Sequence, residues 1–194
     1  DPNDTSKNNL TIAGQTAPYP GITLTSDWHN GKVSLNNIDN VVLRYLKVRM
    51  QNPHNNAGIA VTGDFLPSTN IIVDHCSISW GGWNAMGTGG NLGDVYNIIF
   101  QNNLIGESKT GVIFGDSDTG SSLSYDLSFN GNLFYNVSHR HPNPNSRGGR
   151  IDVLNNIIYN PGFRLSSNTF FPQLNHINNY VHSSRQIYSF SVMP

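Results

Sequence analysis

The sequence predicts an all-β protein that folds as a single-stranded, right-handed parallel β-helix, a solenoid of about six to eight coils. Three observations predict this fold. Short strand-like segments recur at intervals of 23 to 30 residues. Asparagines recur at one fixed place after these segments. The composition, with 28 asparagines and 19 glycines in 194 residues, disfavours helix interiors and suits turns.

The recurring segments are short and apolar, and β-branched residues are common in them, as in strands. Their first residues lie 30, 27, 29, 24 and 23 positions apart, which is the repeat length of stacked architectures. Strand-like stretches at 9–12 and 188–192 extend the series toward both ends. The six central segments begin at Val41, Ile71, Ile98, Leu127, Ile151 and Leu174.

A polar corner follows these segments. Its first position mostly holds residue types that tolerate the left-handed backbone of a tight bend, namely His75, Asn102, Gly131, Asn155 and Asn178. Its second position is Cys76 in one coil and asparagine in the next four. An asparagine amide both donates and accepts, so identical side chains one coil apart can form a ladder. We expect that ladder at Asn103, Asn132, Asn156 and Asn179.

The alternative fold is a β-sandwich with asparagine-rich turns. Sandwich strands usually recur every 8 to 12 residues and do not keep one residue type at one corner, so the β-helix is favoured. We expect residues 1–194 to form one β-helix domain. Neither end shows an amphipathic capping helix, and residue 1 is Asp. The chain is therefore expected to be a fragment of a longer protein, or to stack its coil ends on other chains.

Charge and cysteine content exclude several classes of protein. The formal net charge is -1 and only 12% of residues are charged, which argues against a nucleic-acid partner and against disorder. Cys76 is the only cysteine, so no internal disulfide forms, and we expect it to be buried. No stretch of 18 apolar residues is present, so no membrane span is expected.

Irregular connections between the strands hold the groups with chemical potential. The connection at 138–150 contains three arginines and two histidines, which suit an acidic ligand but also suit a solvated basic loop. Lys109 follows another strand. A single lysine at such a place is ordinarily an exposed residue without a functional role. Trp80 and Trp83 can form a sugar-stacking platform or a packing cap. Asp116 and Asp118 can bind a metal or form a turn.

With these residues in place, the chain resembles the pectate lyase superfamily, polysaccharide lyase family one and its near relatives. The stretch at 11–18 resembles the opening coil of its bacterial and fungal branch, and the stretch at 71–80, around Asp74-His75-Cys76, is similar to its most recognisable motif. Lys109 with 113–118, then 130–142 and 155–160, resemble later motifs in the family's order. The resemblance spans roughly residues 10 to 181.

The resemblance implies β-elimination on a polyuronate. Arg140 stands where the family has its arginine base, and Lys109 matches the lysine that holds a substrate carboxylate. The family's second arginine follows within five residues, where this chain has Asn143 and Asn145, so Arg147 or Arg150 would substitute. We expect His141 and Trp83 to join these arginines in binding an acidic polysaccharide.

The family usually uses Ca²⁺, and here the sequence departs from its pattern. Ala57 stands where an aspartate is expected, and Trp83 and Asn84 stand where acidic residues are expected. Calcium takes six to eight oxygen ligands, usually including carboxylates, so we assign no metal ligand. Asp74 belongs to a motif that supports structure, while Asp64 and Asp94 match no ligand position.

Three functions remain open. The first is a lyase that works without calcium or on a less charged substrate, as pectin lyases do. The second is a catalytically inactive relative that binds polysaccharide or serves as a structural β-helix. The third is a glycoside hydrolase with Asp116 and Asp118 as its carboxylates. Because a polymeric substrate does not enter cells, we expect the parent protein to be secreted or displayed at the cell surface.

Overall fold

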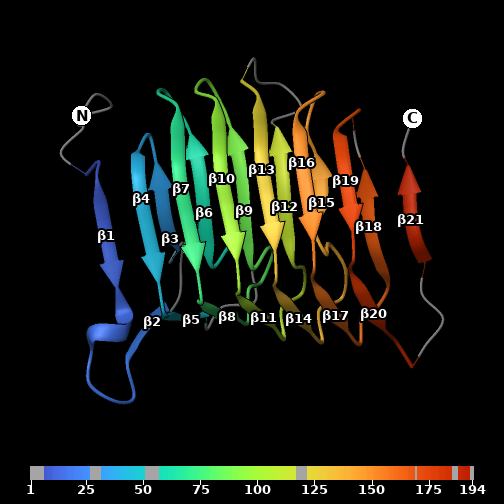
Figure 1. Cartoon of the computed structure of the whole chain (residues 1–194), viewed down its shortest axis with the longest axis horizontal. Helices are drawn as coiled ribbons and strands as arrows, with labels where there is room; N and C mark the ends of the chain where they lie inside the picture. Colours follow the sequence, from blue (N-terminus) through green and yellow to red (C-terminus); the bar gives the residue numbers. More distant parts are fainter. Residues whose placement is uncertain are drawn as a thin grey trace.

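The structure, a computed structural model, describes residues 7–26, 32–50, 57–116, 122–168, 170–184 and 188–192. The chain winds into a parallel β-helix. In Figure 1 it runs downward along the front strands and returns upward behind them while it advances from the N-terminal to the C-terminal end. That sense of winding is right-handed. The predicted fold class is therefore confirmed.

Three sheets run along the solenoid, and every strand pairing among the described residues is parallel. Sheet A contains β1 (Leu10–Ala13), β4 (Asp39–Arg44), β7 (Ser68–Asp74), β10 (Val95–Gln101), β13 (Ser124–Asn130), β16 (Arg150–Leu154) and β19 (Gln173–Ile177). Sheet B contains β2 (Ile22–Ser26), β5 (Leu46–Met50), β8 (Ser77–Ser79), β11 (Leu104–Gly106), β14 (Leu133–Tyr135), β17 (Ile157–Tyr159) and β20 (Tyr180–His182).

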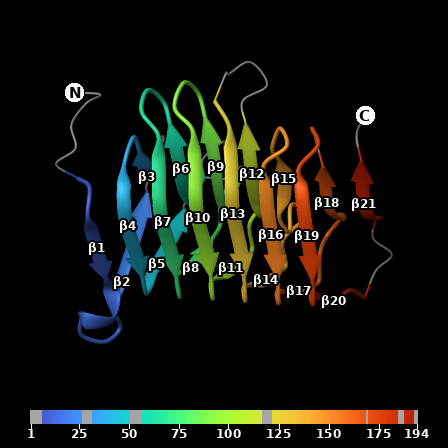
Figure 2. The same ribbon diagram turned by 45° about the horizontal axis from the view of Figure 1, so that its top comes forward.

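Sheet C closes each coil. It contains β3 (Val33–Asn36), β6 (Ile59–Gly63), β9 (Met86–Gly90), β12 (Val112–Asp116) and β15 (Asn143–Asn145). A further pair, β18 (Arg164–Asn168) and β21 (Tyr188–Val192), follows at the C-terminal end, and Figure 2 shows it beyond β15. Among the described residues the one helix is the single 3-10 turn η1 (Gly14–Thr16), and none could span a membrane.

The corner between sheets A and B holds the predicted asparagine ladder. The Nδ2 of Asn103 donates to Oδ1 of Asn132 at 3.0 Å, and Asn132 donates in the same way to Asn156 at 3.0 Å. Asn156 donates to Asn179 at 2.8 Å. Cys76 begins the column, since its backbone N–H donates to Asn103 Oδ1 at 2.9 Å. The residue before each ladder position has a positive φ, between 52° and 65°, as the bend requires.

Two further columns of left-handed residues were not predicted. One lies within or beside the strands of sheet A, where it bends the chain before the apolar segment, and consists of Asn9, Asn40, Asn70, Asn97 and Asp126. The other follows the strands of sheet B and consists of Trp80, Glu107, Asn136 and Asn160. Several of these side chains are also linked from coil to coil, for example Asn160 Nδ2 to Asn136 Oδ1 at 2.7 Å. Asparagine thus recurs because several corners of each coil need a left-handed residue.

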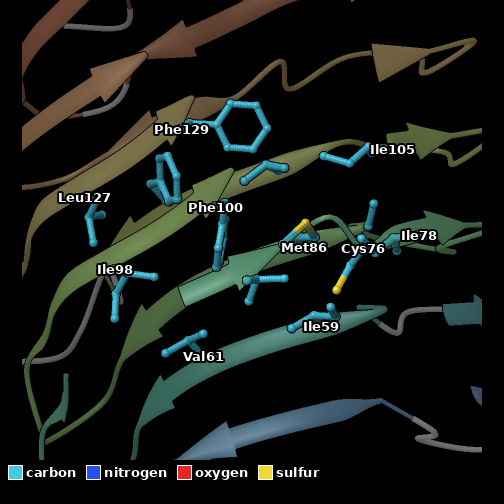
Figure 3. Packing of buried hydrophobic residues seen from close by; sticks show 14 of the residues in the cluster. Ile59, Val61, Cys76, Ile78, Met86, Ile98, Phe100, Ile105, Leu127 and Phe129 are labelled. Atoms are coloured by element: carbon cyan, nitrogen blue, oxygen red, sulfur yellow. The ribbon is translucent and has the colours of Figure 1, made fainter. Parts of the chain in front are cut away.

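The core is a stack of inward-facing apolar side chains, aligned by the strand register (Figure 3). Val41, Ile71, Ile98 and Leu127 lie one above another in sheet A, each at most 1% exposed. Phe100, Phe114, Phe129 and Phe134 form a continuous aromatic row, with centroids 5.2 to 6.1 Å apart. Cys76 is 2% exposed within this core, as expected. The strand register that aligns these core residues also determines which loops of successive coils lie beside one another on the surface.

Candidate active site

The candidate site lies on the connections from sheet B to sheet C in three successive coils, and it continues at the start of β18 in the fourth. Trp83 lies between β8 and β9, Lys109 between β11 and β12, and Arg140 between β14 and β15. Arg164 begins β18, one coil after Arg140. Backbone hydrogen bonds join these connections, including Gly111 N–H to the His139 carbonyl at 2.8 Å and Phe163 N–H to the Ser138 carbonyl at 2.8 Å. Residues far apart in sequence are therefore neighbours here.

Trp83 lies beside two of the cations. Its side chain is among the exposed large apolar groups, at 45%. The Lys109 Nζ lies 5.5 Å from a Trp83 ring centroid, and the Arg140 Cζ lies 5.1 Å from it. Both distances lie within the range of cation–π attraction. Trp83, Lys109 and Arg140, which we expected at one site from the sequence, therefore lie next to one another.

The guanidinium of Arg140 is hydrogen-bonded through one nitrogen, while another nitrogen has no partner among the described residues. Its φ is 70°, a left-handed conformation that is uncommon outside glycine. Its Nη1 donates to Oδ1 of Asn84 at 2.6 Å, and the Thr110 hydroxyl donates to the same oxygen at 2.9 Å. Its Nε is buried and has no hydrogen-bond partner among the described residues. The guanidinium is therefore anchored while part of its donor capacity is unused.

Arg164 lies one coil after Arg140 and was not among the site residues expected from the sequence. The ladder spacing from Asn132 to Asn156 is 24 residues, and the same step from Arg140 leads to Arg164. That arithmetic could have found it. The Arg164 Nε is likewise buried with no partner among the described residues. Its Cζ lies 5.8 Å from the ring centroid of Phe163.

The charges in this cluster are all of one sign. Burial, and next the charge of Arg164, lower the pKa of Arg140. Burial, and next the charges of Arg140, Arg164 and Lys109, together lower the pKa of His139 to about 4. Each charged group that acts on Arg140 or His139 in the described part of the chain is a cation. We call the group formed by Lys109, Arg140 and Arg164, which lies beside the neutral His139, the cationic cluster, and its charge suits an anionic ligand.

Three residues expected at the site lie elsewhere. His141 is 2% exposed, with ring nitrogens 3.0 Å from the Leu165 carbonyl and 3.2 Å from the Val137 carbonyl, so a surface ligand does not reach it. Arg147 lies on the connection from sheet C to sheet A, with its Cζ 5.1 Å from the Phe170 ring centroid. Arg150 begins β16 in sheet A and pairs with Asp126 at 2.6 Å. We therefore omit all three from the proposed site.

Two other features lie outside the cationic cluster. Trp80 donates from Nε1 to Glu107 at 3.1 Å and has Arg49 near its ring, so it belongs to a separate group. A cavity of about 720 Å³ lies on sheet A around Asp126, Arg150 and Asp152. A smaller cavity of about 290 Å³ adjoins the cluster, since Ser108 and Ser138, which precede Lys109 and His139, line it.

The described residues do not fit calcium. No group of three or more His, Cys, Asp or Glu side chains gathers in the described part of the chain. The Asn84 oxygen already accepts from two donors, one of them a cation. Ala57 lies beside Asn84, because the N–H of Gly58 donates to the Asn84 carbonyl at 3.2 Å, but it brings no oxygen ligand from its side chain. A divalent ion would also meet the charge of Arg140.

The other aspartates lie elsewhere. Asp74 lies at the corner of sheets A and B and accepts from Arg44, Gln101 and Asn102. Asp64 accepts from Asn36 Nδ2 at 2.7 Å and Asp94 from Leu123 N–H at 2.8 Å, both on the connections from sheet C to sheet A. Asp116 ends β12, with its side chain undescribed, and Asp118 lies outside the described residues.

The family model described as pectate lyase matches residues 3–192. The chain belongs to the pectate lyase family. Among curated relatives, probable pectate lyase C of Aspergillus terreus and that of Aspergillus flavus are each 33% identical over 156 residues. The corresponding protein of Emericella nidulans is 31% identical. Each alignment covers 79% of this chain and 33% of the relative, so the chain spans about one third of their length.

Proposed function

We propose that this chain cleaves a polyuronate by β-elimination, with Arg140 as the base and Lys109 and Arg164 as ligands of uronate carboxylates. The observation that carries the proposal is the cationic cluster beside the exposed ring of Trp83, where the charged neighbours of Arg140 and His139 among the described residues are all positive. Membership of the pectate lyase family supports lyase chemistry at the family level. The secretion of the parent protein follows as part of the proposal, because its substrate is a polymer outside the cell.

The chemistry requires one proton transfer and one bond cleavage. A base removes the proton at C5 of a uronate, and the electron pair moves into the C4–C5 bond while the C4–O bond breaks. The products are a 4,5-unsaturated uronide and a new chain end. Charge develops on the carboxylate in the transition state, where fixed cations stabilise it. Arg140 must be neutral to accept the proton, and its lowered pKa supports that role.

The proposed lyase does not depend on calcium. Lys109 and Arg164 supply positive charge in a site whose described residues do not fit the ion. Methylated pectin carries fewer negative charges than polygalacturonate, so the site needs fewer positive charges to bind it. We therefore expect cleavage in the presence of a chelator, with no gain from added calcium.

The test is a lyase assay on polygalacturonate and on highly methylated pectin. The unsaturated product absorbs in the ultraviolet, so the expected result is a steady rise in absorbance for the wild-type chain. Arg140→Ala should lose about 10²- to 10⁴-fold, the contribution of a positioned base. Lys47→Ala removes a partly exposed lysine on sheet B and serves as the charge control. Equal rates for Arg140→Ala and wild type would exclude Arg140 as the base.

A second function is a polysaccharide-binding or structural β-helix without activity. The observation that favours it is that no cluster of carboxylates lies beside Arg140 in the described part of the chain. Binding of polygalacturonate without any rise in absorbance would support this function. New reducing ends without absorbance would instead indicate a hydrolase, for which Asp116 and Asp118 are the candidates.

A further inference from the structure

Arg140 is held by a buried amide rather than by a carboxylate. Asn84 is 7% exposed and lies 56 residues before Arg140, yet its Oδ1 accepts from Arg140 Nη1 at 2.6 Å. A guanidinium has donors only, so the oxygen of the amide, and not its nitrogen, must face Arg140. The Thr110 hydroxyl donates to the same oxygen at 2.9 Å. The amide is therefore fixed in one orientation from two coils.

We propose that Asn84 is a positioning residue for Arg140, which fixes the direction of the guanidinium through a neutral oxygen and contributes no counter-charge. This inference rests on the function proposed above. It assigns to Asn84 and Thr110 a shared role: Thr110 orients the amide, and the amide orients the arginine. The substrate then meets an arginine whose position is set before binding.

The neutrality of Asn84 matters because of the groups that face Arg140. Arg164 approaches from β18, Lys109 and Arg140 lie near Trp83, and His139 precedes Arg140 in the chain. Burial and Arg164 lower the pKa of Arg140. A carboxylate at position 84 would favour the charged guanidinium and oppose this effect. Asparagine is almost the same size as aspartate, so the two differ here chiefly in charge.

The kinetic test compares Asn84→Asp, Asn84→Ala and Thr110→Val, with a chelator present so that a new carboxylate cannot act through calcium. Asn84→Asp should move the alkaline rise of the pH–rate profile upward, with about a tenfold loss of rate at fixed pH for each unit by which the Arg140 pKa rises. Asn84→Ala should lower kcat about tenfold with little change in KM, and Thr110→Val should do so less strongly. Asn97→Asp makes the same charge change on sheet A and is the matched control.

The second test does not depend on activity. Side-chain nitrogen NMR of the arginines, assigned with Arg140→Lys, reports how freely the Arg140 guanidinium rotates. We expect slow rotation in the wild-type chain and faster rotation in Asn84→Ala. Circular dichroism melts show whether each variant folds. A folded Asn84→Ala with unchanged rotation would overturn the proposal.

The outcomes separate the two proposals. If the wild-type chain has no lyase activity but Asn84→Ala frees the guanidinium, the lyase function fails and the positioning contact stands. If the wild-type chain is active and Asn84→Asp keeps its pH profile and rate, the positioning role is wrong and the lyase function stands. A fall in melting temperature with unchanged kcat, KM and pH profile would indicate a merely structural role and also contradict the proposal.

Discussion

Buried polar groups differ between two regions of the molecule. At the corner between sheets A and B they are paired, and at the connection between sheets B and C some of them are not. At the corner, buried amides satisfy one another: Asn132 accepts from Asn103 and donates to Asn156, at 3.0 Å each. At the connection, the Nε atoms of Arg140 and Arg164 are buried without a partner among the described residues. Buried polar groups are costly unless they are paired. We infer that the paired amides of the corner stabilise the fold, and that the unpaired donors at the connection are available to a ligand.

The largest expected effect is at the ladder. Asn132→Ala removes the acceptor of Asn103 and the donor to the Phe100 carbonyl, and both groups stay buried. Because each unpaired buried group costs about 1–3 kcal/mol, the free energy of unfolding should fall by about 4 kcal/mol. Urea unfolding measures it, with the exposed Asn175→Ala as a control expected to change little. Equal losses for the two variants would remove the distinction between corner and surface.

The next effect is a loss of stability in acid. Burial lowers the pKa of His141 to about 4, so the folded chain resists protonation that the unfolded chain accepts near pH 6.5. Stability is therefore fully present above about pH 6.5 and is lost as the pH falls toward 4, by up to about 3 kcal/mol. His141→Phe should flatten part of this slope, the remainder belonging to His139 and His176, whose pKa values are also lowered by burial. Unfolding free energies across this pH range measure it, and an unchanged slope would contradict the assignment.

A smaller effect is expected at Arg164. Arg164→Ala removes a proposed ligand of a uronate carboxylate, so KM for polygalacturonate should rise about tenfold, which corresponds to about 1.4 kcal/mol. Stability should hold, since the removed Nε has no partner in the described part of the chain. Arg147→Ala and Arg150→Ala decide between sequence and structure: the sequence predicts a similar rise in KM, and the structure does not. Initial rates over a range of substrate concentrations measure all three.

The smallest effect is expected at Trp83. Trp83→Phe keeps an aromatic face beside Lys109 and Arg140 but weakens the cation–π contact, by about 0.5–1 kcal/mol at an exposed position. We expect a rise in KM of a few fold and little change in melting temperature. A large fall in melting temperature would show that Trp83 is a packing cap instead.

The repeating coils of the β-helix and their asparagine ladder could be predicted from the sequence. Asn103, Asn132, Asn156 and Asn179 share one corner because the strand register repeats, and their spacing alone places them in a ladder. The other left-handed columns were missed, because Asn40, Asn70 and Asn97 stand beside or within apolar stretches that read as strand.

The site could be predicted only in part. Lys109, Arg140 and Trp83 were expected together and lie together. Arg164 was missed because the second arginine was sought along the same loop and not one coil later. The contact of Asn84 with Arg140 spans 56 residues and depends on how far a long side chain reaches, which no spacing in the sequence records.

The ladder also has an electrical direction. Each amide donates its Nδ2 to the oxygen of the next coil, from Asn103 through Asn132 and Asn156 to Asn179, so the amide dipoles are aligned head to tail along the axis. Aligned hydrogen bonds polarise one another and strengthen together. Substituting a middle amide would therefore divide one cooperative chain of dipoles into two shorter ones, and the coils on either side would lose part of their mutual support.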